Sequence, residues 1–196
     1  MTRKEYLAEY LNWFWLRPEN AIMLAIRAEK YASTFEYLKG YSLDVSCGDG
    51  VFSFIAAGGK IDAGCDMFQS LNLGDRRGDF DAFDFWDSRY GIEVVKEPEF
   101  SYTHGLDWKK NLLNKAELLN FYDNLAVHDN NEHLPYNDNY FSYIYSNSTY
   151  WVGSFEKHIM DLYRVLKPGG HMILEIKTRN IFKFSASVYA DGILGE

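Results

Sequence analysis

Apolar and polar residues alternate along the chain with a strand-like period in some stretches and a helix-like period in others. Short apolar runs predict five strands, at residues 41–45, 60–66, 124–129, 140–147 and 171–176. Apolar stripes with helical spacing predict helices between them, at 51–57, 112–119 and 155–166. Alternation of this kind requires a mostly parallel sheet with helices on both faces, so we expect an α/β fold, a three-layer α/β/α sandwich.

Two regions depart from this alternation. Residues 1–40 are predicted as two helices before the first strand, and Pro18 is well placed to begin the second of them. In that second helix, Ile22 and Ile26 fall on one apolar stripe. Residues 67–103 are rich in aspartate, glycine and aromatic residues and have no clean period, so we expect an insertion there.

The composition narrows the class of protein. The chain has 196 residues, 47% of them hydrophobic, which is enough for one packed domain. Its net charge of −8 argues against a nucleic-acid partner, which normally needs a basic face, and gives no attraction to anionic membranes. The charged start has no signal-peptide core, no apolar run reaches the ~20 residues that span a bilayer, and two cysteines make no disulfide framework. We therefore expect a cytoplasmic protein.

A glycine-containing segment, DVSCGDG, follows the first predicted strand. Gly48 and Gly50 allow a sharp turn and let main-chain N–H groups approach a ligand without interference from Cβ atoms. In an open parallel sheet, ligands bind beyond the carboxyl ends of the strands. Asp66 ends the second predicted strand, beside the first, and is suited to accept hydrogen bonds from a ribose diol. Together, the turn and the carboxylate predict a nucleoside site.

Three motifs resemble those of one enzyme family. LDVSCGDG at 43–50 is similar to the first motif of the Rossmann-like (class I) S-adenosylmethionine-dependent methyltransferases. LPYNDNYFSYIYSN at 134–147 resembles the stretch that leads into the family's fourth strand, and LYRVLKPGGHMILEI at 162–176 resembles its following helix end and fifth strand. The similarity, to a methyltransferase type 11 domain, covers about residues 40–178.

The resemblance implies S-adenosylmethionine as the cofactor and suggests how this chain would hold it. The turn would be anchored by Asp44, and the methionine part would be surrounded by Ser46, Cys47 and Gly48, with Gly50 completing the turn. The ribose would be held by Asp66, the adenine amine by either Asp129 or Asn130, and the sulfonium and amino group would lie near Ser146 and Asn147.

The chain also departs from the family pattern. Ser46 replaces the first glycine, which requires a backbone conformation that tolerates a Cβ atom. The family's sheet has seven strands, whereas this chain ends near the fifth. We expect residues 41–196 to form the cofactor-binding domain, truncated before its C-terminal strands, and residues 1–40 to form a helical cap on the acceptor side.

Candidates for acid–base chemistry are fewer and less specific. An alcohol acceptor needs a base, and the candidates are His104, Asp107, His128 and His133, whereas His158 is expected on the surface. Tyr150 and Trp151 follow the fourth predicted strand and are candidates for contact with the sulfonium, the alternative being that they pack under the following helix. The acidic insertion lacks the spacing of a calcium loop, so no metal site is expected.

These observations favour a methyltransferase acting on a small-molecule acceptor. Residues 14–21 and 146–152 resemble bacterial methyltransferases encoded with surface-glycan genes, which suggests a sugar or a nucleotide-sugar as acceptor. A nicotinamide-dependent oxidoreductase is an alternative, although Ser53 stands where the fingerprint G-x-G-x-x-G needs its third glycine. A non-catalytic, methyltransferase-like binding module is the other alternative. The sequence does not predict the oligomeric state.

Overall fold

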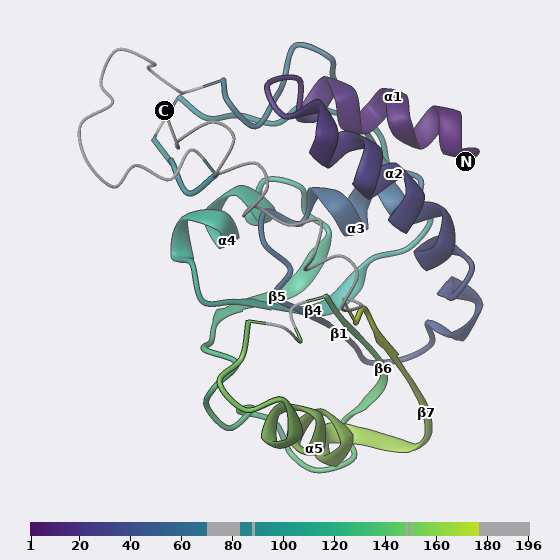
Figure 1. Cartoon of the computed structure of the whole chain (residues 1–196), viewed down its shortest axis with the longest axis vertical. Helices are drawn as coiled ribbons and strands as arrows, with labels where there is room; N and C mark the ends of the chain where they lie inside the picture. Colours follow the sequence, from purple (N-terminus) through teal and green to yellow (C-terminus); the bar gives the residue numbers. More distant parts are fainter. Residues whose placement is uncertain (70–82, 88, 148, 150, 177–196) are drawn as a thin grey trace, which may run out of the picture.

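A five-stranded parallel sheet forms the centre of the computed structural model, which describes residues 1–69, 83–87, 89–147, 149 and 151–176 (Figure 1). Its order is β5-β4-β1-β6-β7, and each neighbouring pair is parallel. The strands are β1 (Ser42–Val45), β4 (Tyr102–Asp107), β5 (Tyr122–Val127), β6 (Phe141–Ser146) and β7 (Leu166–Leu174). The predicted α/β class with a mostly parallel sheet is therefore confirmed.

Helices cover both faces of the sheet (Figure 1). One side carries α1 (Arg3–Trp13), α2 (Pro18–Ala32), α3 (Val51–Ala56) and α4 (Lys110–Glu117), and the other carries α5 (Phe155–Val165). Alternate side chains of a strand point to opposite faces, which gives the sheet two apolar layers. Leu43 and Val45 of β1 pack on the α5 side, while Tyr143 and Tyr145 of β6 pack on the side of the other helices.

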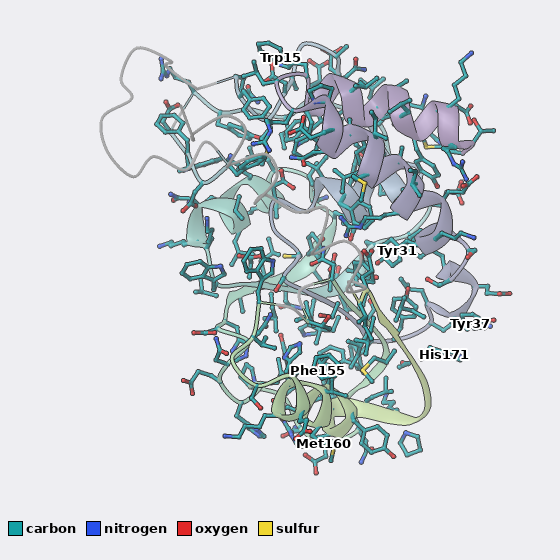
Figure 2. The ribbon with its side chains drawn as sticks, viewed as in Figure 1. Trp15, Tyr31, Tyr37, Phe155, Met160 and His171 are labelled. Atoms are coloured by element: carbon teal, nitrogen blue, oxygen red, sulfur yellow. The ribbon has the colours of Figure 1, made fainter. Side chains whose placement is uncertain are left out.

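The N-terminal helices are fastened to the sheet layer through α3. Two tyrosine hydroxyls of α1 donate to main-chain oxygens of α3, from Tyr6 to Ala56 at 3.0 Å and from Tyr10 to Phe52 at 2.9 Å. Tyr31 of α2 stacks on Tyr145 of β6, with ring centroids 3.9 Å apart (Figure 2). A short 3-10 helix, Phe35–Tyr37, then leads to β1 and stacks its Tyr37 ring on His171 of β7 (Figure 2).

The buried face of α2 differs from the predicted one. Ile22 and Ile26 are exposed, and the buried residues are Ala21, Ala25, Ala28 and Tyr31. Alanine side chains let α2 approach the neighbouring helix and sheet closely, so the larger isoleucines are turned outward. The apolar stripe predicted for the helix at 155–166 is also narrower in the structure, because Phe155, the first residue of α5, is exposed (Figure 2).

The second predicted strand, 60–66, is wrong. The strand found in this region is only Lys60–Ile61 (β2). It pairs antiparallel with β3 (Val94–Lys96) in a separate two-stranded sheet. The strand ends because the Asp62 carboxylate accepts the Gly64 N–H at 2.8 Å, which closes a local turn. The neighbour of β1 is instead β4, which lies at the end of the region predicted as an insertion. Asp66 therefore does not end a strand beside β1.

Candidate nucleoside site

The turn after β1 takes the left-handed conformation at three alternating positions. The φ angles are +59° at Ser46, +60° at Gly48 and +75° at Gly50. This conformation is readily available only to glycine, which explains the two glycines and makes Ser46 a strained exception. Ser46 thus keeps the backbone conformation of the glycine that it replaces.

The two glycines of the turn have different surroundings. A Cβ atom at Gly48 would meet no atom of the described residues within 4 Å, so the main chain there faces space that this part of the chain leaves open. A Cβ atom at Gly50 would lie 2.9 Å from the Tyr122 ring and 3.2 Å from Leu119. Gly48 therefore leaves room for a ligand, whereas Gly50 lets the turn pack against the segment that links α4 to β5.

A cavity of about 620 Å³ lies at the carboxyl ends of β1, β4, β5 and β6. Its walls combine polar side chains with two indole rings: Ser46, Asp107, Trp108, Lys109, Leu112, His128, Asp129, Asn130, Asn131, Asn147, Trp151 and Val152. Its volume falls in the range of small-ligand sites, about 300–1,000 Å³. Loops from four strands converge on it because all carboxyl ends of a parallel sheet meet at one edge.

Asp107 occupies the place that the sequence assigned to Asp66. It ends β4, the strand beside β1, and its carboxylate accepts the N–H groups of Gly48 at 3.0 Å and of Lys109 at 2.9 Å. Burial raises the pKa of Asp107, and these two hydrogen bonds oppose the rise. A carboxylate joined to the glycine turn in this way is placed to accept from a ribose diol.

The prediction for Asp66 is therefore corrected. Asp66 accepts the Phe68 N–H at 2.6 Å in an irregular segment and is not among the residues that line the cavity. The signal for Asp107 was present in GLDW, residues 105–108, where a glycine and an acid end an inconspicuous strand just before a helical stripe. The sequence alone marks Asp107 only as a candidate base.

Asn130 and Asp129, the two candidates for the adenine amine, both line the cavity. The Asn130 amide donates to the Ser46 hydroxyl at 2.7 Å and so joins the loop after β5 to the turn after β1. Asp129 instead accepts from the main-chain N–H of Asn131 at 2.9 Å and from its side-chain amide at 2.8 Å, and these bonds lower the pKa of Asp129. Asn130 is thus the one tied to the turn.

Of the other predicted cofactor residues, Asn147 lines the cavity, whereas three are buried and do not line it. Asp44 is buried and accepts from the Ser53 hydroxyl at 2.6 Å and from the Tyr122 hydroxyl at 2.8 Å. Burial raises the pKa of Asp44 to about 7. Cys47 and Ser146 are buried too and do not line the cavity.

The histidine candidates lie in different places. His128 lines the nucleoside cavity, and burial lowers its pKa. His104 is half-buried among Tyr136, Tyr140 and Phe141, away from the cavity. Tyr150 lies outside the described residues.

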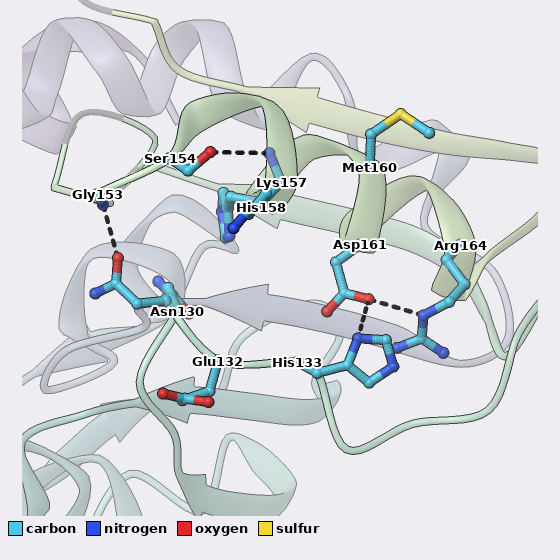
Figure 3. A pocket seen from close by; sticks show the side chains of 11 residues that line it. Asn130, Glu132, His133, Gly153, Ser154, Lys157, His158, Met160, Asp161 and Arg164 are labelled. Carbon is cyan, nitrogen blue, oxygen red and sulfur yellow. Dashed lines mark hydrogen bonds and ion pairs between the residues drawn. The ribbon is translucent and has the colours of Figure 1, made fainter.

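His133 and His158 line a second cavity of about 610 Å³ between the loop after β5 and α5 (Figure 3). The exposed His133 ring faces Asp161, with 3.0 Å between Nδ1 and Oδ1 (Figure 3). His158 is only 4% exposed, so its predicted surface position is wrong. Burial lowers the pKa of His158, and its Nε2 atom has no hydrogen-bond partner among the residues that the structure describes.

Comparisons with known proteins agree with this architecture. Residues 88–174, which run from before β3 to the end of β7, match a family model described as a methyltransferase domain. A SAM-dependent methyltransferase from Thermotoga maritima, described as a possible histamine N-methyltransferase, superposes with a TM-score of 0.50 at 15% identity, over 87% of this chain and 61% of that one. An S-adenosylmethionine-dependent methyltransferase from Mesorhizobium loti gives 0.45 at 19% identity, over 77% and 54%. Residues 88–174 are therefore similar to a methyltransferase domain, and the fold resembles that of the S-adenosylmethionine-dependent methyltransferase from Thermotoga maritima.

One curated relative adds a more particular likeness. It is a malonyl-[acyl-carrier protein] O-methyltransferase from Buchnera aphidicola subsp. Baizongia pistaciae, 38% identical over 82 residues. The match covers 41% of this chain and 33% of the relative, so the chain spans about a third of that protein's length. Within the described residues, no helix is long and apolar enough to cross a membrane.

Proposed function

We propose that the chain is a methyltransferase that binds S-adenosylmethionine in the cavity beside Asp107 and methylates a small-molecule acceptor. The observation that carries the proposal is the carboxylate at the end of β4, hydrogen-bonded to the main chain of a turn whose Gly48 faces open space. The family match over residues 88–174 supports it as well, and that match includes Asp107 but not the turn.

The residues present fit the chemistry of the cofactor. The Asp107 carboxylate is an acceptor for two ribose hydroxyls, and the bare main chain at Gly48 leaves room for the methionine tail. Asn147, at the end of β6, offers amide donors and acceptors beside the turn. The cofactor supplies an activated methyl group on a sulfonium, so the protein mainly has to align and desolvate the acceptor. Alignment alone is worth about 7–11 kcal/mol of a barrier.

The acceptor is the less constrained part of the proposal. The sugar or nucleotide-sugar suggested by the sequence has no counterpart among the relatives described above, whereas the curated relative's name specifies an O-methyltransferase. We propose an oxygen acceptor. Transfer of labelled methyl groups to a panel of carboxylates, sugars and nucleotide-sugars tests this choice, and transfer only to nitrogen or sulfur compounds would contradict it.

Calorimetry with two matched carboxylate variants tests cofactor binding. We expect wild type and Asp66→Ala to bind S-adenosylhomocysteine alike, because Asp66 lies outside the cavity. Asp107→Ala should weaken binding by at least about tenfold, since two charge-assisted hydrogen bonds are lost. Equal binding by Asp107→Ala and wild type, or a loss confined to Asp66→Ala, would place the ribose elsewhere.

The two alternatives predict different titrations. The nicotinamide alternative needs a third glycine where Ser53 donates its hydroxyl to Asp44, so we expect no heat on adding NAD. The binding-module alternative predicts cofactor binding with no transfer to any acceptor. Methyl transfer to one member of the panel would exclude it.

A further inference from the structure

The cavity lined by His133 and His158 takes no part in the proposed methyl transfer. It has a volume of about 610 Å³ and lies between α5 and the loop after β5 (Figure 3). We call it the α5 cavity, because α5 and the two residues before it supply most of its walls. Asn130 and Asn131 line both this cavity and the nucleoside cavity. The α5 cavity is therefore a separate space beside the nucleoside cavity.

His158 brings an unsatisfied hydrogen-bond acceptor to the α5 cavity. Its nearly buried ring is directed from α5 toward the loop after β5 (Figure 3). A hydrogen bond to the Asn130 main chain raises the pKa of His158, so the ring is the donor in that bond. Since Nε2 lacks a partner in the part of the chain that the structure describes, the donor is Nδ1. Burial has the larger effect and lowers the pKa, which leaves the ring neutral and Nε2 an acceptor.

A buried acceptor of this kind points to a ligand. The large majority of buried polar side-chain atoms in proteins have a hydrogen-bond partner, which is either protein or ordered solvent. The Nε2 atom of His158 lies in the wall of a cavity large enough for a small molecule. A ligand that brings an O–H or N–H group would satisfy it.

The N-terminus of α5 gives the same cavity a positive end. The helix has 11 residues, and the N–H groups of a first turn have no partner within their own helix. These groups and the helix dipole favour an anion. Ser154 caps the helix by accepting the Lys157 N–H at 3.4 Å, and the Lys157 ammonium adds a positive charge to the same turn. Ser154 and Lys157 both line the cavity.

The two acidic residues of the cavity oppose an anion only in part. The Asp161 carboxylate accepts the Leu134 N–H at 2.5 Å and the Arg164 Nε–H at 2.7 Å. The His133 Nδ1 atom also lies 3.0 Å from it, so the Asp161 charge is compensated within the wall. Glu132 lies in the loop across from α5 (Figure 3) and is the carboxylate that opposes an anion. The cavity thus combines a positive end at α5 with one acceptor at its wall.

A phosphate group that carries one proton meets both requirements. Its anionic oxygens suit the N-terminus of α5 and Lys157, and its O–H group is a donor for the Nε2 atom of His158. Sulfate has the same shape but carries no proton at neutral pH. We propose that the α5 cavity is a second ligand site, which binds a protonated phosphate group. The site does not depend on the proposed function, and its volume has room for free phosphate or for a phosphate monoester.

Calorimetry on the whole chain at pH 7 compares inorganic phosphate with sulfate. We expect phosphate to bind at least about tenfold more tightly, because sulfate leaves the buried Nε2 atom unpaired. Lys157→Gln should weaken both anions by a similar factor and keep their ratio. His158→Gln offers an amide donor, so it should bring the ratio close to one. Lys30→Gln is the matched control, because Lys30 is exposed on α2 and does not line the cavity.

Each outcome supports or overturns the proposal. No binding of phosphate at millimolar concentration, equal affinity for the two anions, or a ratio that His158→Gln leaves unchanged would overturn it. Binding of both anions that neither substitution alters would show an adventitious ion only, and would overturn it too. The ratio in the wild type needs no substitution, so it decides the matter even if circular dichroism shows that the buried His158→Gln variant does not fold.

Methyl phosphate distinguishes the two sources of the phosphate group. The comparison is made at pH 6, where a monoester keeps this proton in about half of its molecules. Tighter binding of methyl phosphate than of inorganic phosphate supports the site with an ester as its ligand. Weaker binding of methyl phosphate supports the site with the free ion as its ligand.

Discussion

The glycines of the turn after β1 serve two different purposes, and substitution separates them. Gly48 faces open space, so Gly48→Ala should cost only the strain of a left-handed alanine, about 1–2 kcal/mol. Its methyl group would project into the ligand space, so we expect binding of S-adenosylhomocysteine to fall sharply. Gly50→Ala adds a clash with Tyr122 to the same strain and should cost about 3 kcal/mol or more.

Urea unfolding and calorimetry on the two variants give the comparison. Asn120→Gly is a useful reference, because Asn120 is also left-handed at φ +48° and lies outside the cavity. It should bind ligand like the wild type. A Gly48→Ala variant that is less stable than Gly50→Ala, or that binds normally, would contradict this division of roles.

Asp44 should make stability depend on pH. Its folded-state pKa is raised to about 7 by burial, so the native state holds a proton that the unfolded chain has lost. The stability from protonated Asp44 is full below about pH 4 and is lost as the pH rises through about 7. Asp44→Asn keeps a carbonyl acceptor for Ser53 and Tyr122 and does not ionise.

The free energy of unfolding of Asp44→Asn, relative to wild type, should therefore increase by about 3 kcal/mol from pH 5 to pH 8. Urea unfolding at both pH values measures it. A difference that does not change with pH would show that Asp44 does not titrate in this range.

At the scale of elements, a buried lysine joins the inserted region to the turn. Lys115 of α4 is fully buried, donates to the Phe83 carbonyl at 3.0 Å and lies 4.8 Å from the Tyr90 ring centroid. It also lowers the pKa of the buried Asp49, against the larger rise caused by burial. Asp49 in turn accepts from the Trp13 indole of α1 at 3.2 Å. Lys115 thus joins α4 to the inserted region and acts on Asp49 of the turn through its charge.

Removing the Lys115 ammonium should lower the free energy of unfolding. Neutralising Asp49 as well should make that loss smaller. Lys115→Met leaves Asp49 buried without its cation and should destabilise the chain by about 3–5 kcal/mol. Adding Asp49→Asn should recover part of that loss, because an amide has no charge to bury. Strictly additive effects of the two substitutions in urea unfolding would show that the residues are not coupled.

The strands show how far the sequence predicts the elements. β1 and β6 were predicted because their apolar runs are strong. β4 was missed because its residues, YTHGLD, include only one aliphatic side chain, and Gly105 is needed where Tyr122 and Leu125 pack closely. The wrong second strand also led to the wrong ribose ligand. Asp66 is predicted for that role because it is expected beside β1, and Asp107 holds that place.

At the scale of the whole molecule, the site depends on strand order more than on any motif. Asp107, Asn130 and Asn147 follow different strands and line one cavity because β5, β4, β1 and β6 are parallel and adjacent. Local sequence predicted the glycine turn, Asn147 and the pair Asp129 and Asn130, since motifs mark them. It did not predict the place of Asp107 beside the turn, because that place depends on which strands become neighbours.

The most direct test of the account is a crystal structure of the protein with S-adenosylhomocysteine bound. We predict density for the ribose hydroxyls on the Asp107 carboxylate and for the amino-acid tail over Gly48. Density for the ligand beside Asp66, or in the cavity between α5 and the loop after β5 shown in Figure 3, would contradict it.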